Sequence, residues 1–464
     1  MNIILIAVIG LFFASMLAIG FAASKKQKTA EDFFVGGRSF GLLTSTATQI
    51  ATGFGGGIML AQVGIGYRWG FSALIYSSVA IPIGIFILAK FFARWLRGQE
   101  FYTTTDWMCF QYGESKTLRT LTSIVVALYA VAAWVAQPVA AGKILNIVTG
   151  LPVEAGIVIA ALVVVIYTLS GGIMAVAYTD VAQLGLMIVA VVVLLPLVIS
   201  EAGGLGEVFS SVPSENLTLN GVGNDVLLAW FLALLPAQIV KQTYHQRIYG
   251  AKTEGIAVQG LYNMAIASIL IGFWAALLGM SIYSINPNLA DQEQAMIWVV
   301  QHVLHGGVSI VVIAAIIAAI VSSADSALHS ASGCLTRDIY QMVIKPGASD
   351  KEIMAVSKIC IAIVGIAGVV IGIAAPNVLQ ALLLGYSMTA AGLFFPLILG
   401  HYWKGATRLG AIAGIAGGVL STLVFKLVGT PFDYMPAVFW GLLASMVATI
   451  AMSKLGVTTD VAPE

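Results

Sequence analysis

A stripe of polar side chains runs through one otherwise apolar segment of the sequence, Ala318 to Tyr340. Its members share the spacing of a single helical face, and they are Ser322, Ser323, Asp325, Ser326, His329, Ser330 and Gly333. A carboxylate at membrane depth is costly unless it faces a polar interior, so Asp325 indicates a functional site. The alternative is a helix–helix contact in which small Ser and Ala residues permit close packing, and Asp325 argues against it.

The same stripe contains residue types that are found in hydrolases. Ser322 and Ser326 could serve as nucleophiles and His329 as a base. A catalytic triad needs side chains that converge on one another, whereas side chains on one helical face rise in parallel. We therefore expect that the protein is not an enzyme.

The composition defines the class of protein that carries this stripe. Of the 464 residues, 59% are hydrophobic and 9% are charged, whereas soluble domains carry about 25% charged residues. Many apolar runs are long enough to cross a bilayer, which predicts an all-α polytopic membrane protein. The net charge of +1 gives no sign of a nucleic-acid partner, and three scattered cysteines indicate neither a disulfide framework nor a zinc site.

The apolar runs predict thirteen transmembrane helices in a single transmembrane domain, 1–464. The predicted spans are 3–23, 41–66, 71–96, 118–148, 152–170, 175–200, 226–247, 256–284, 296–334, 355–375, 378–401, 407–428 and 434–453. Most of the 22 Lys and Arg residues fall in alternate loops, and Arg119 and Arg247 are counted among them. The positive-inside rule then predicts an integral plasma (inner) membrane protein with its N-terminus outside and its C-terminus in the cytoplasm.

Two of the predicted spans contain helix breakers at corresponding places. The second span holds Gly53 and Gly55 to Gly57, and the seventh holds Pro236 followed by a polar stretch. Breaks at matching positions in two groups of five helices predict an inverted repeat with the binding site at the breaks. The repeats would be 41–200 and 226–401, with an extra N-terminal helix and cytoplasmic loop in 1–40 and two peripheral helices in 407–453.

Several sequence motifs resemble those of a known family, the sodium/solute symporters. They are DFFVGGRS (32–39), YTLSGGIMAVAYTDVAQ (167–183), YHQRIYGAK (244–252) and SSADSALHSASGCLTRDIY (322–340). Within the family, AVAYTD, SSADS and GASDKEI (347–353) are most similar to the high-affinity choline transporter subgroup. The resemblance implies a leucine-transporter-like 5+5 inverted repeat, alternating access, and uptake of a small-molecule solute driven by sodium as the coupling ion.

The resemblance also implies a sodium site between the first and eighth core helices. Carried over by motif, its ligands would be the carbonyls of Ala47, Ile50 and Ala319 and the hydroxyls of Ser322 and Ser323. Oxygen ligands suit a hard cation.

A second cation site is implied for some members of the family. Here it would combine Asp180 with Asp325 and Ser326, and the two carboxylates would hold either a cation or a proton. In the alternative interpretation, Asp180 only caps the N-terminus of its helix.

The solute site implied by the choline subgroup would be an aromatic cage for a quaternary ammonium. Where that subgroup has aromatic residues, this chain has Gly53 and Lys241, and only Trp134 could remain as a wall. A lysine near the cavity favours a carboxylate, so we expect a small anionic or zwitterionic solute. Lys241 could instead snorkel to the surface or pair with Asp325.

Other polar or aromatic residues on the same spans are expected to face the solute. They are Gln49, Phe54, Gln238, Tyr386, Ser387 and Thr389. A choline- or betaine-type amine, a neutral sugar, nucleoside or urea-like solute, and a passive channel remain as alternatives. The sequence leaves the oligomeric state open.

Overall fold

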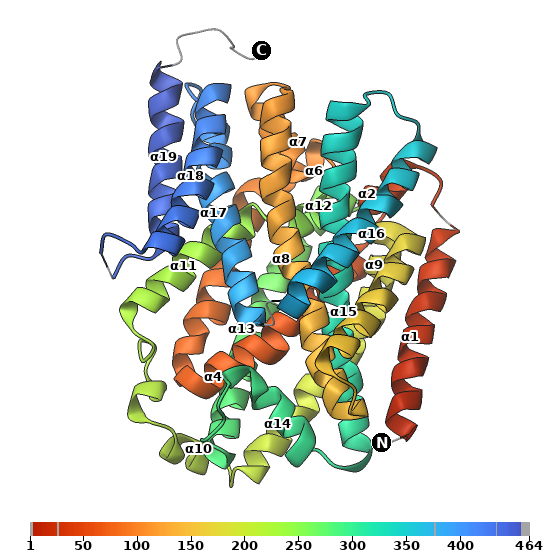
Figure 1. Ribbon diagram of the computed structural model, residues 1–464, viewed down its shortest axis with the longest axis vertical. Helices are drawn as coiled ribbons and strands as arrows, with labels where there is room; N and C mark the ends of the chain where they lie inside the picture. The colour runs from red at the N-terminus through yellow and green to blue at the C-terminus, as the bar shows by residue number, and fades with distance from the viewer. Residues whose placement is uncertain (1–2, 26, 375–376, 433, 456–464) are drawn as a thin grey trace.

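The computed structural model describes residues 3–25, 27–374, 377–432 and 434–455 as an all-helical bundle (Figure 1). Its principal helices are α1 (Ile3–Ser24), α2 (Ala30–Val35), α3 (Leu42–Gly53), α4 (Val63–Trp69), α5 (Ile81–Ile87), α6 (Ala93–Gly98), α7 (Thr104–Tyr112), α8 (Lys116–Thr149), α9 (Val153–Glu201), α10 (Leu205–Ser211), α11 (Asn224–Ile239), α12 (Gln242–Gly250), α13 (Glu254–Ile285), α14 (Ala295–His302), α15 (Gly306–Gly333), α16 (Asp350–Ala374), α17 (Val378–Tyr402), α18 (Arg408–Val428) and α19 (Ala437–Leu455).

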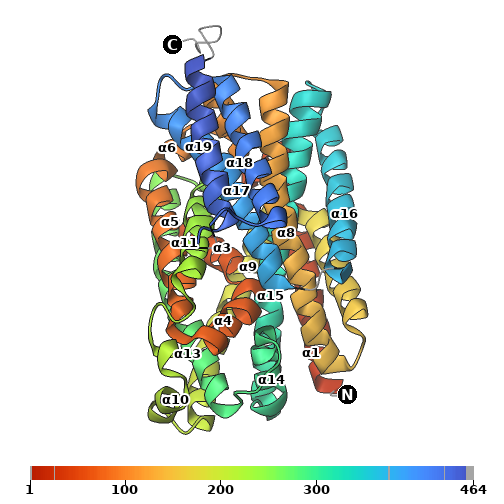
Figure 2. The same ribbon diagram turned by 60° about the vertical axis from the view of Figure 1, so that its left-hand side comes forward.

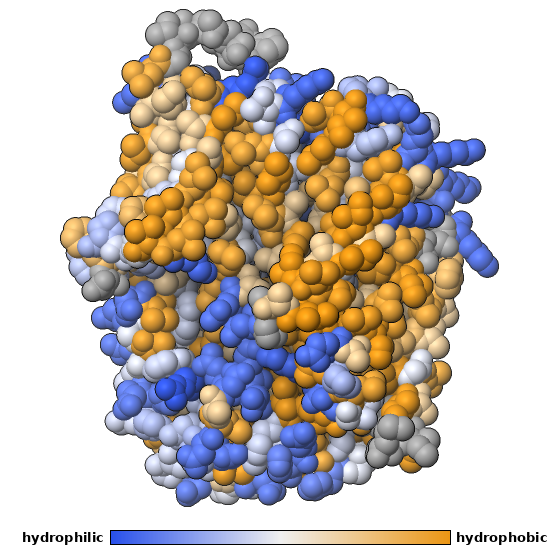
Figure 3. Space-filling view, in the orientation of Figure 1, coloured by the Kyte–Doolittle hydropathy of each residue, from blue (hydrophilic) through white to orange (hydrophobic). Residues whose placement is uncertain are grey.

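Eleven helices in the described part of the chain are long and apolar enough to cross a bilayer, and one bent pair would make twelve. The predicted number of thirteen is not confirmed, because the predicted span 152–170 corresponds to an apolar helix of only 17 residues, Val153–Leu169. Figure 3 shows a broad hydrophobic surface, in orange, on this face of the molecule, and hydrophilic residues gather at the lower end of the molecule. The two ends of the described chain lie at opposite ends of the molecule (Figure 1).

One predicted span is divided in the structure, and two others are joined through a kink. The span 296–334 is divided into α14 and α15, because Gly306 has a φ of 60° and begins a new helix. The spans 152–170 and 175–200 correspond to Val153–Leu169 and Gly171–Glu201, which are continuous as α9 but meet at the non-helical residue Gly172.

The predicted break in the second span is confirmed. Leu42–Gly53 and Gly57–Ser72 meet at 51°, and Phe54 and Gly55 between them are not helical. Gly55 has no room for a side chain: a Cβ there would collide with Ser323 and lie 2.9 Å from Gln137 Oε1. The glycine therefore lets the break approach α15 and α8 closely.

The second break separates α11 from α12 at Val240 and Lys241. Pro236 lies inside α11 and precedes the break by one turn. Both interruptions turn backbone amides and carbonyls away from their own helix, so these groups must be satisfied by neighbours.

Helix α15 occupies the centre of the bundle (Figures 1 and 2). Every residue from Val312 to Gly333 is buried, and α8, α9 and α3 pack around this segment. The helices α18 and α19 lie together at one flank, and α1 lies against α9. The polar stripe of α15 therefore faces protein on all sides and not lipid.

Two basic residues assigned to loops by the sequence are buried in helices. Arg247 in α12 is fully buried and Arg119 in α8 is 2% exposed. Arg119 donates to Asp106 Oδ1 at 2.8 Å and to Asp338 Oδ1 at 3.1 Å. The loop assignment of these two residues was wrong, because both side chains have carboxylate partners on other helices.

We predict that Gly172→Ala lowers the stability of the folded protein by at least about 2 kcal/mol. Gly172 has a φ of +48° and a ψ of −156°, a region that residues with a Cβ avoid, and a Cβ would lie 2.8 Å from the Phe33 carbonyl oxygen. Thermal unfolding of purified protein measures the change. Gly185→Ala in the same helix is the control, since a Cβ there meets nothing within 4 Å; equal losses in both variants would contradict the prediction.

Candidate functional site

The first feature of the site is the contact between the broken first core helix and two serines of α15. Ser322 Oγ donates to the carbonyls of Ala51 at 3.0 Å and Ala319 at 2.9 Å. Ser323 Oγ donates to the carbonyl of Thr52 at 2.8 Å. Because α3 ends at Gly53, its last carbonyls run out of amide partners. The Ala51 carbonyl accepts from the Phe54 amide at 3.1 Å and gains Ser322 as a second donor, and Ser323 donates to the Thr52 carbonyl.

This contact differs from the ligand set predicted by motif. The carbonyls that meet the serines belong to Ala51 and Thr52, not to Ala47 and Ile50. Ala47 lies inside α3, where its carbonyl faces the amide of Ala51 one turn further on. Ala319, Ser322 and Ser323 lie at this contact, whereas the α3 carbonyls that the serines meet lie two to four residues after Ile50 and Ala47; the sodium ligand set itself stays a prediction.

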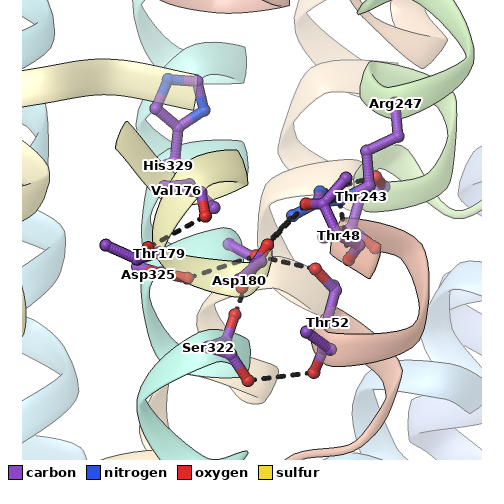
Figure 4. A network of polar contacts seen from close by, with 12 residues as sticks. Thr48, Thr52, Val176, Thr179, Asp180, Thr243, Arg247, Ser322, Asp325 and His329 are labelled. Carbon is purple, nitrogen blue, oxygen red and sulfur yellow. Dashed lines mark hydrogen bonds and ion pairs between the residues drawn. The ribbon is translucent and has the colours of Figure 1, made fainter. Parts of the chain in front are cut away.

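A buried ionic network lies next to this contact (Figure 4). Arg247 Nη2 lies 3.5 Å from Asp180 Oδ2 and donates to Ser326 Oγ at 2.6 Å. Its Nε donates to Thr48 Oγ1 at 2.8 Å, and Thr48 in turn donates to Asp180. These side chains come from α12, α9, α15 and α3, and all are fully buried. The network thus joins the two broken spans to α9 and α15.

Asp325 belongs to the same polar region. Its Oδ2 accepts a hydrogen bond from Tyr167 OH at 2.6 Å, and its Oδ1 lies 3.3 Å from Ser326 Oγ. Ser326 Oγ also lies 2.9 Å from Thr52 Oγ1, next to the serine contact. Two carboxylates and one guanidinium leave one negative charge without a compensating charge among these groups.

The structure brings together the three residues predicted for a second cation site, Asp180, Asp325 and Ser326. It also adds Arg247, which the sequence had assigned to a loop. The capping interpretation of Asp180 is wrong, because the segment of α9 after the Gly172 kink begins several residues earlier. Asp180 Oδ1 has no hydrogen-bond partner among the described residues.

A cavity of about 70 Å³ lies where the two breaks meet. Gly53 and Gly55 line it from the first break and Lys241 and Thr243 from the second. Thr52 and Ser323 also line it, so these two residues belong both to the cavity and to the serine–carbonyl contact. None of the described residues that line the cavity is acidic.

Lys241 is the charged residue among those that line this cavity. It is 5% exposed, its Nζ donates to Tyr244 OH at 3.2 Å, and it lies 4.3 Å from the centre of the Tyr244 ring. Neither alternative for this residue agrees with the structure: it is too buried to snorkel, and its neighbours are tyrosines rather than Asp325. No ion pair of Lys241 is found in the described part of the chain.

Three of the predicted solute-facing residues line the cavity, and they are Gly53, Lys241 and Tyr386. The other six, Gln49, Phe54, Trp134, Gln238, Ser387 and Thr389, are absent from its lining. Trp134 packs against Gly368 of α16, Phe54 packs on Trp274, and Gln238 Nε2 and Ser387 Oγ donate to carbonyls of their own helices. Gln49 is fully buried, and neither of its amide atoms has a hydrogen-bond partner among the described residues. Thr389 Oγ1 is also without one in that part of the chain.

Sequence reasoning missed several residues that line the cavity. The main ones are Gln62, Tyr76, Tyr129, Gln137 and Tyr244. Gln137 Oε1 accepts a hydrogen bond from the Gly56 amide at 2.8 Å, so it satisfies the broken backbone directly. A glutamine in an apolar span was a signal for this role, whereas the tyrosines carry no such signal in a sequence of this composition.

Comparison with known proteins gives one family. The model of the sodium:solute symporter family matches residues 33–418. The human high-affinity choline transporter is 29% identical over 94% of this chain and 78% of its own length. The sodium/proline symporter of Escherichia coli (strain K12) is 25% identical over 94% of this chain and 90% of its own length.

Two solved structures are similar in fold. A sodium-coupled sialic acid symporter superposes with a TM-score of 0.86 at 21% identity, and each chain is covered completely. A nucleobase-cation-symport family transporter with bromovinylhydantoin bound has a TM-score of 0.61 at 15% identity, over 92% of this chain and 96% of its own. These neighbours agree with the predicted fold class, an all-α protein with a leucine-transporter-like architecture.

We predict that Arg247→Gln destabilises the protein by about 3–5 kcal/mol, because it leaves the buried carboxylates of Asp180 and Asp325 without a cation. Asp180→Asn should cost less, because Asp325 still faces the guanidinium. The double variant should lose less than the sum of the two, since Asp180→Asn removes one of the two charges that Arg247→Gln leaves unpaired. Thermal or denaturant unfolding measures the coupling. Arg94→Gln is the control: Arg94 is 77% exposed and 3.9 Å from Glu254, so its loss should change stability by less than about 1 kcal/mol. Strictly additive losses at positions 180 and 247 would refute the coupling.

Proposed function

Because the chain belongs to the sodium:solute symporter family, we propose that it imports a small organic solute with a carboxylate group, an anion or a zwitterion, coupled to sodium. The observation that carries this proposal is Lys241, a buried cation in a cavity that has no acidic lining residue in the described chain. A buried charge without a partner is costly. A carboxylate on the solute would supply the missing charge.

The sodium ion would bind at the contact between α3 and α15. The oxygen atoms gathered there are the carbonyls of Ala51, Thr52 and Ala319 and the hydroxyls of Ser322 and Ser323. This is an all-oxygen donor set of the kind that hard cations prefer. When sodium binds, the serine hydroxyls would no longer donate to the carbonyls. The carbonyl oxygens would contact the ion directly, and each hydroxyl would rotate so that a lone pair of its oxygen points at the ion. The proposed set keeps Ala319, Ser322 and Ser323 and replaces Ala47 and Ile50.

The excess negative charge beside this contact supports the binding of a cation there. Asp180 and Asp325 face the single guanidinium of Arg247, and Ser326 connects them to Thr52. A second cation would bind to Asp180, Asp325 and Ser326 only in a state in which Arg247 has moved away. In the proposed cycle, Arg247 supplies the positive charge at this second position and one sodium ion accompanies the solute.

Coupling between ion and solute would follow from the residues that the two sites share. Thr52 and Ser323 line the cavity and also form the serine–carbonyl contact, so an ion that orders this contact also shapes the cavity. Such a coupling is reciprocal: the solute strengthens the binding of sodium by the same factor. A tenfold sodium gradient supplies about 1.4 kcal/mol, which would support about tenfold accumulation of an anion, because one sodium ion and one anion carry no net charge. For a zwitterion, the net charge that crosses 100 mV adds about 2.3 kcal/mol, and accumulation would reach about two to three orders of magnitude.

The remaining proposals concern the architecture and the membrane. Residues 41–200 and 226–401 would be the inverted repeats, and alternating access would move the broken spans against α8, α9 and α15. The side rich in Lys and Arg would face the cytoplasm, with the N-terminus outside and the C-terminus inside.

We predict that Ser322→Ala and Ser323→Ala each raise the sodium concentration for half-maximal stabilisation at least tenfold, because each removes an oxygen ligand. Sodium-dependent thermal shifts of purified protein in choline-free potassium buffer measure this. Ser332→Ala is the matched control: this buried serine of α15 donates to the carbonyl of His329 in its own helix, and its loss should leave sodium affinity unchanged. Unchanged sodium affinity in both site variants would rule the site out.

A carrier and a channel differ in whether they accumulate solute. We predict that proteoliposomes with an inward sodium gradient concentrate a labelled small carboxylate above its outside concentration, and that a sodium ionophore abolishes the accumulation. A channel would only equilibrate the solute. A panel of carboxylates, amino acids, betaines and amines, with sodium and with potassium, would identify the substrate; accumulation that is independent of sodium would refute the proposed coupling.

A further inference from the structure

The ammonium group of Lys241 is surrounded by aromatic rings from three separate helices. Its Nζ lies 5.4 Å from the ring centre of Tyr129 in α8, 4.3 Å from that of Tyr244 in α12 and 5.5 Å from that of Tyr386 in α17. Tyr129 and Tyr386 also contact each other, with their ring centres 5.1 Å apart. We call Tyr129, Tyr244 and Tyr386 the tyrosine cage.

Such an arrangement is the usual recognition site for a quaternary or other organic cation. Rings within about 6 Å attract a cation through their negative faces, and the attraction grows when water is excluded. All three cage tyrosines are buried, and all three line the central cavity. Here the cation inside the cage is a side chain of the protein itself.

The position of Lys241 has two consequences for a solute. A second organic cation cannot enter the cage while the ammonium fills it, and the two like charges would repel each other in a cavity without acidic lining residues in the described chain. A carboxylate, in contrast, meets an ammonium whose hydrogen-bond partners in the described structure are the hydroxyls of Tyr244 and Tyr129. Lysine offers three donors, so one remains for a ligand.

We infer that Lys241 acts as a built-in occupant of a cation cage and restricts the solute to small carboxylates without an ammonium group. This inference rests on the proposed function and narrows it from anions or zwitterions to anions. The carboxylate binds the Lys241 ammonium, and the apolar part of the solute lies against side chains such as Ile58, Met264 and Leu382. A cavity of about 70 Å³ has room for roughly five water molecules, so the solute is a short-chain monocarboxylate.

The inference predicts a change of specificity when the built-in cation is removed. Lys241→Ala empties the cage but leaves its three rings in place. This variant loses carboxylate binding and gains binding of a quaternary ammonium. Lys241→Arg keeps the charge, so it retains a preference for carboxylates over choline.

The experiment uses purified full-length protein and thermal-shift titrations with propionate, glycine betaine and choline as probes, each in sodium and in potassium buffer. In the unmodified protein we expect sodium-dependent stabilisation by propionate, at least tenfold weaker binding of betaine, and no binding of choline. In Lys241→Ala we expect propionate affinity to fall at least tenfold and choline affinity to rise at least tenfold. Lys426→Ala is the control, because this exposed lysine of α18 lies outside the cavity lining.

The cage itself is tested by a second change. In Lys241→Ala combined with Tyr386→Leu, the gained choline binding should fall at least tenfold, whereas Tyr386→Phe in the same background keeps the ring and should retain it. Choline binding by the unmodified protein, or a Lys241→Ala variant that folds but does not gain it, would overturn the inference. Stabilisation by sodium alone is read in the same samples, so loss of that signal would instead overturn the proposed sodium site.

Discussion

The structure depends on how the interrupted end of α3 is satisfied in the middle of a bilayer-spanning bundle. A helix that stops at Gly53 leaves its last carbonyls without amide partners, and an apolar environment makes each of them costly. The hydroxyl of Ser323 supplies the Thr52 carbonyl, and that of Ser322 adds a second donor to the Ala51 carbonyl, which also accepts from the amide of Phe54. On the other side of the break, Gln137 accepts from the amide of Gly56. The close approach of these groups requires glycine at position 55, because any Cβ there would occupy the place of Ser323. The break is therefore a site held open by α8 and α15, and its oxygen atoms are available to a cation at little further cost in reorganisation.

The buried charges are arranged in two separate groups around this break. On one side, Asp180, Asp325 and Arg247 form a network with an excess of negative charge. On the other side, Lys241 stands alone among tyrosines in the cavity. A cation bound near the two carboxylates, and an anion bound near Lys241, would each give a buried charge the partner of opposite sign that it lacks in the protein alone. Because Thr52 and Ser323 lie between the two groups, this distribution of charge explains why a cation and an anion would bind together more readily than either alone.

Much of the fold and part of the site could be predicted from the sequence. Apolar runs gave the spans, glycine gave the first break, and the serine stripe gave the buried face of α15, since these follow from local composition and helical periodicity. The register of α3 against α15 was not predictable, because the residue at which a broken helix stops is decided by its tertiary contacts; the serines of α15 meet the carbonyls of Ala51 and Thr52, and not that of Ala47. Trp134 was predicted to face the solute, but Ala133 and Gln137 of the same helix line the cavity instead. A shift of one residue along a helix turns the side chain by about 100°, so a small error in register places the wrong residue in the site. The cage around Lys241 joins positions 129, 244 and 386, and no local pattern connects residues so far apart in the chain.

Arg247 shows why a charge count alone misplaces a functional residue. The positive-inside rule treats an arginine near the end of a span as a loop residue, but α12 begins only after the second break and carries Arg247 back into the bundle. There it contacts Thr48 and Ser326, one on the first broken span and one on α15. A movement of α3 and α12 together against α15 would keep the bond to Thr48 but break the bond to Ser326, and with it the compensation of Asp325. The movement would therefore cost free energy. Either a second cation that replaces the guanidinium near Asp325, or the binding of solute and sodium to the moved state, would have to offset this cost. For this reason the same arginine that stabilises the described state would also oppose movement when the sites are empty, as the proposed coupling between sodium and solute requires.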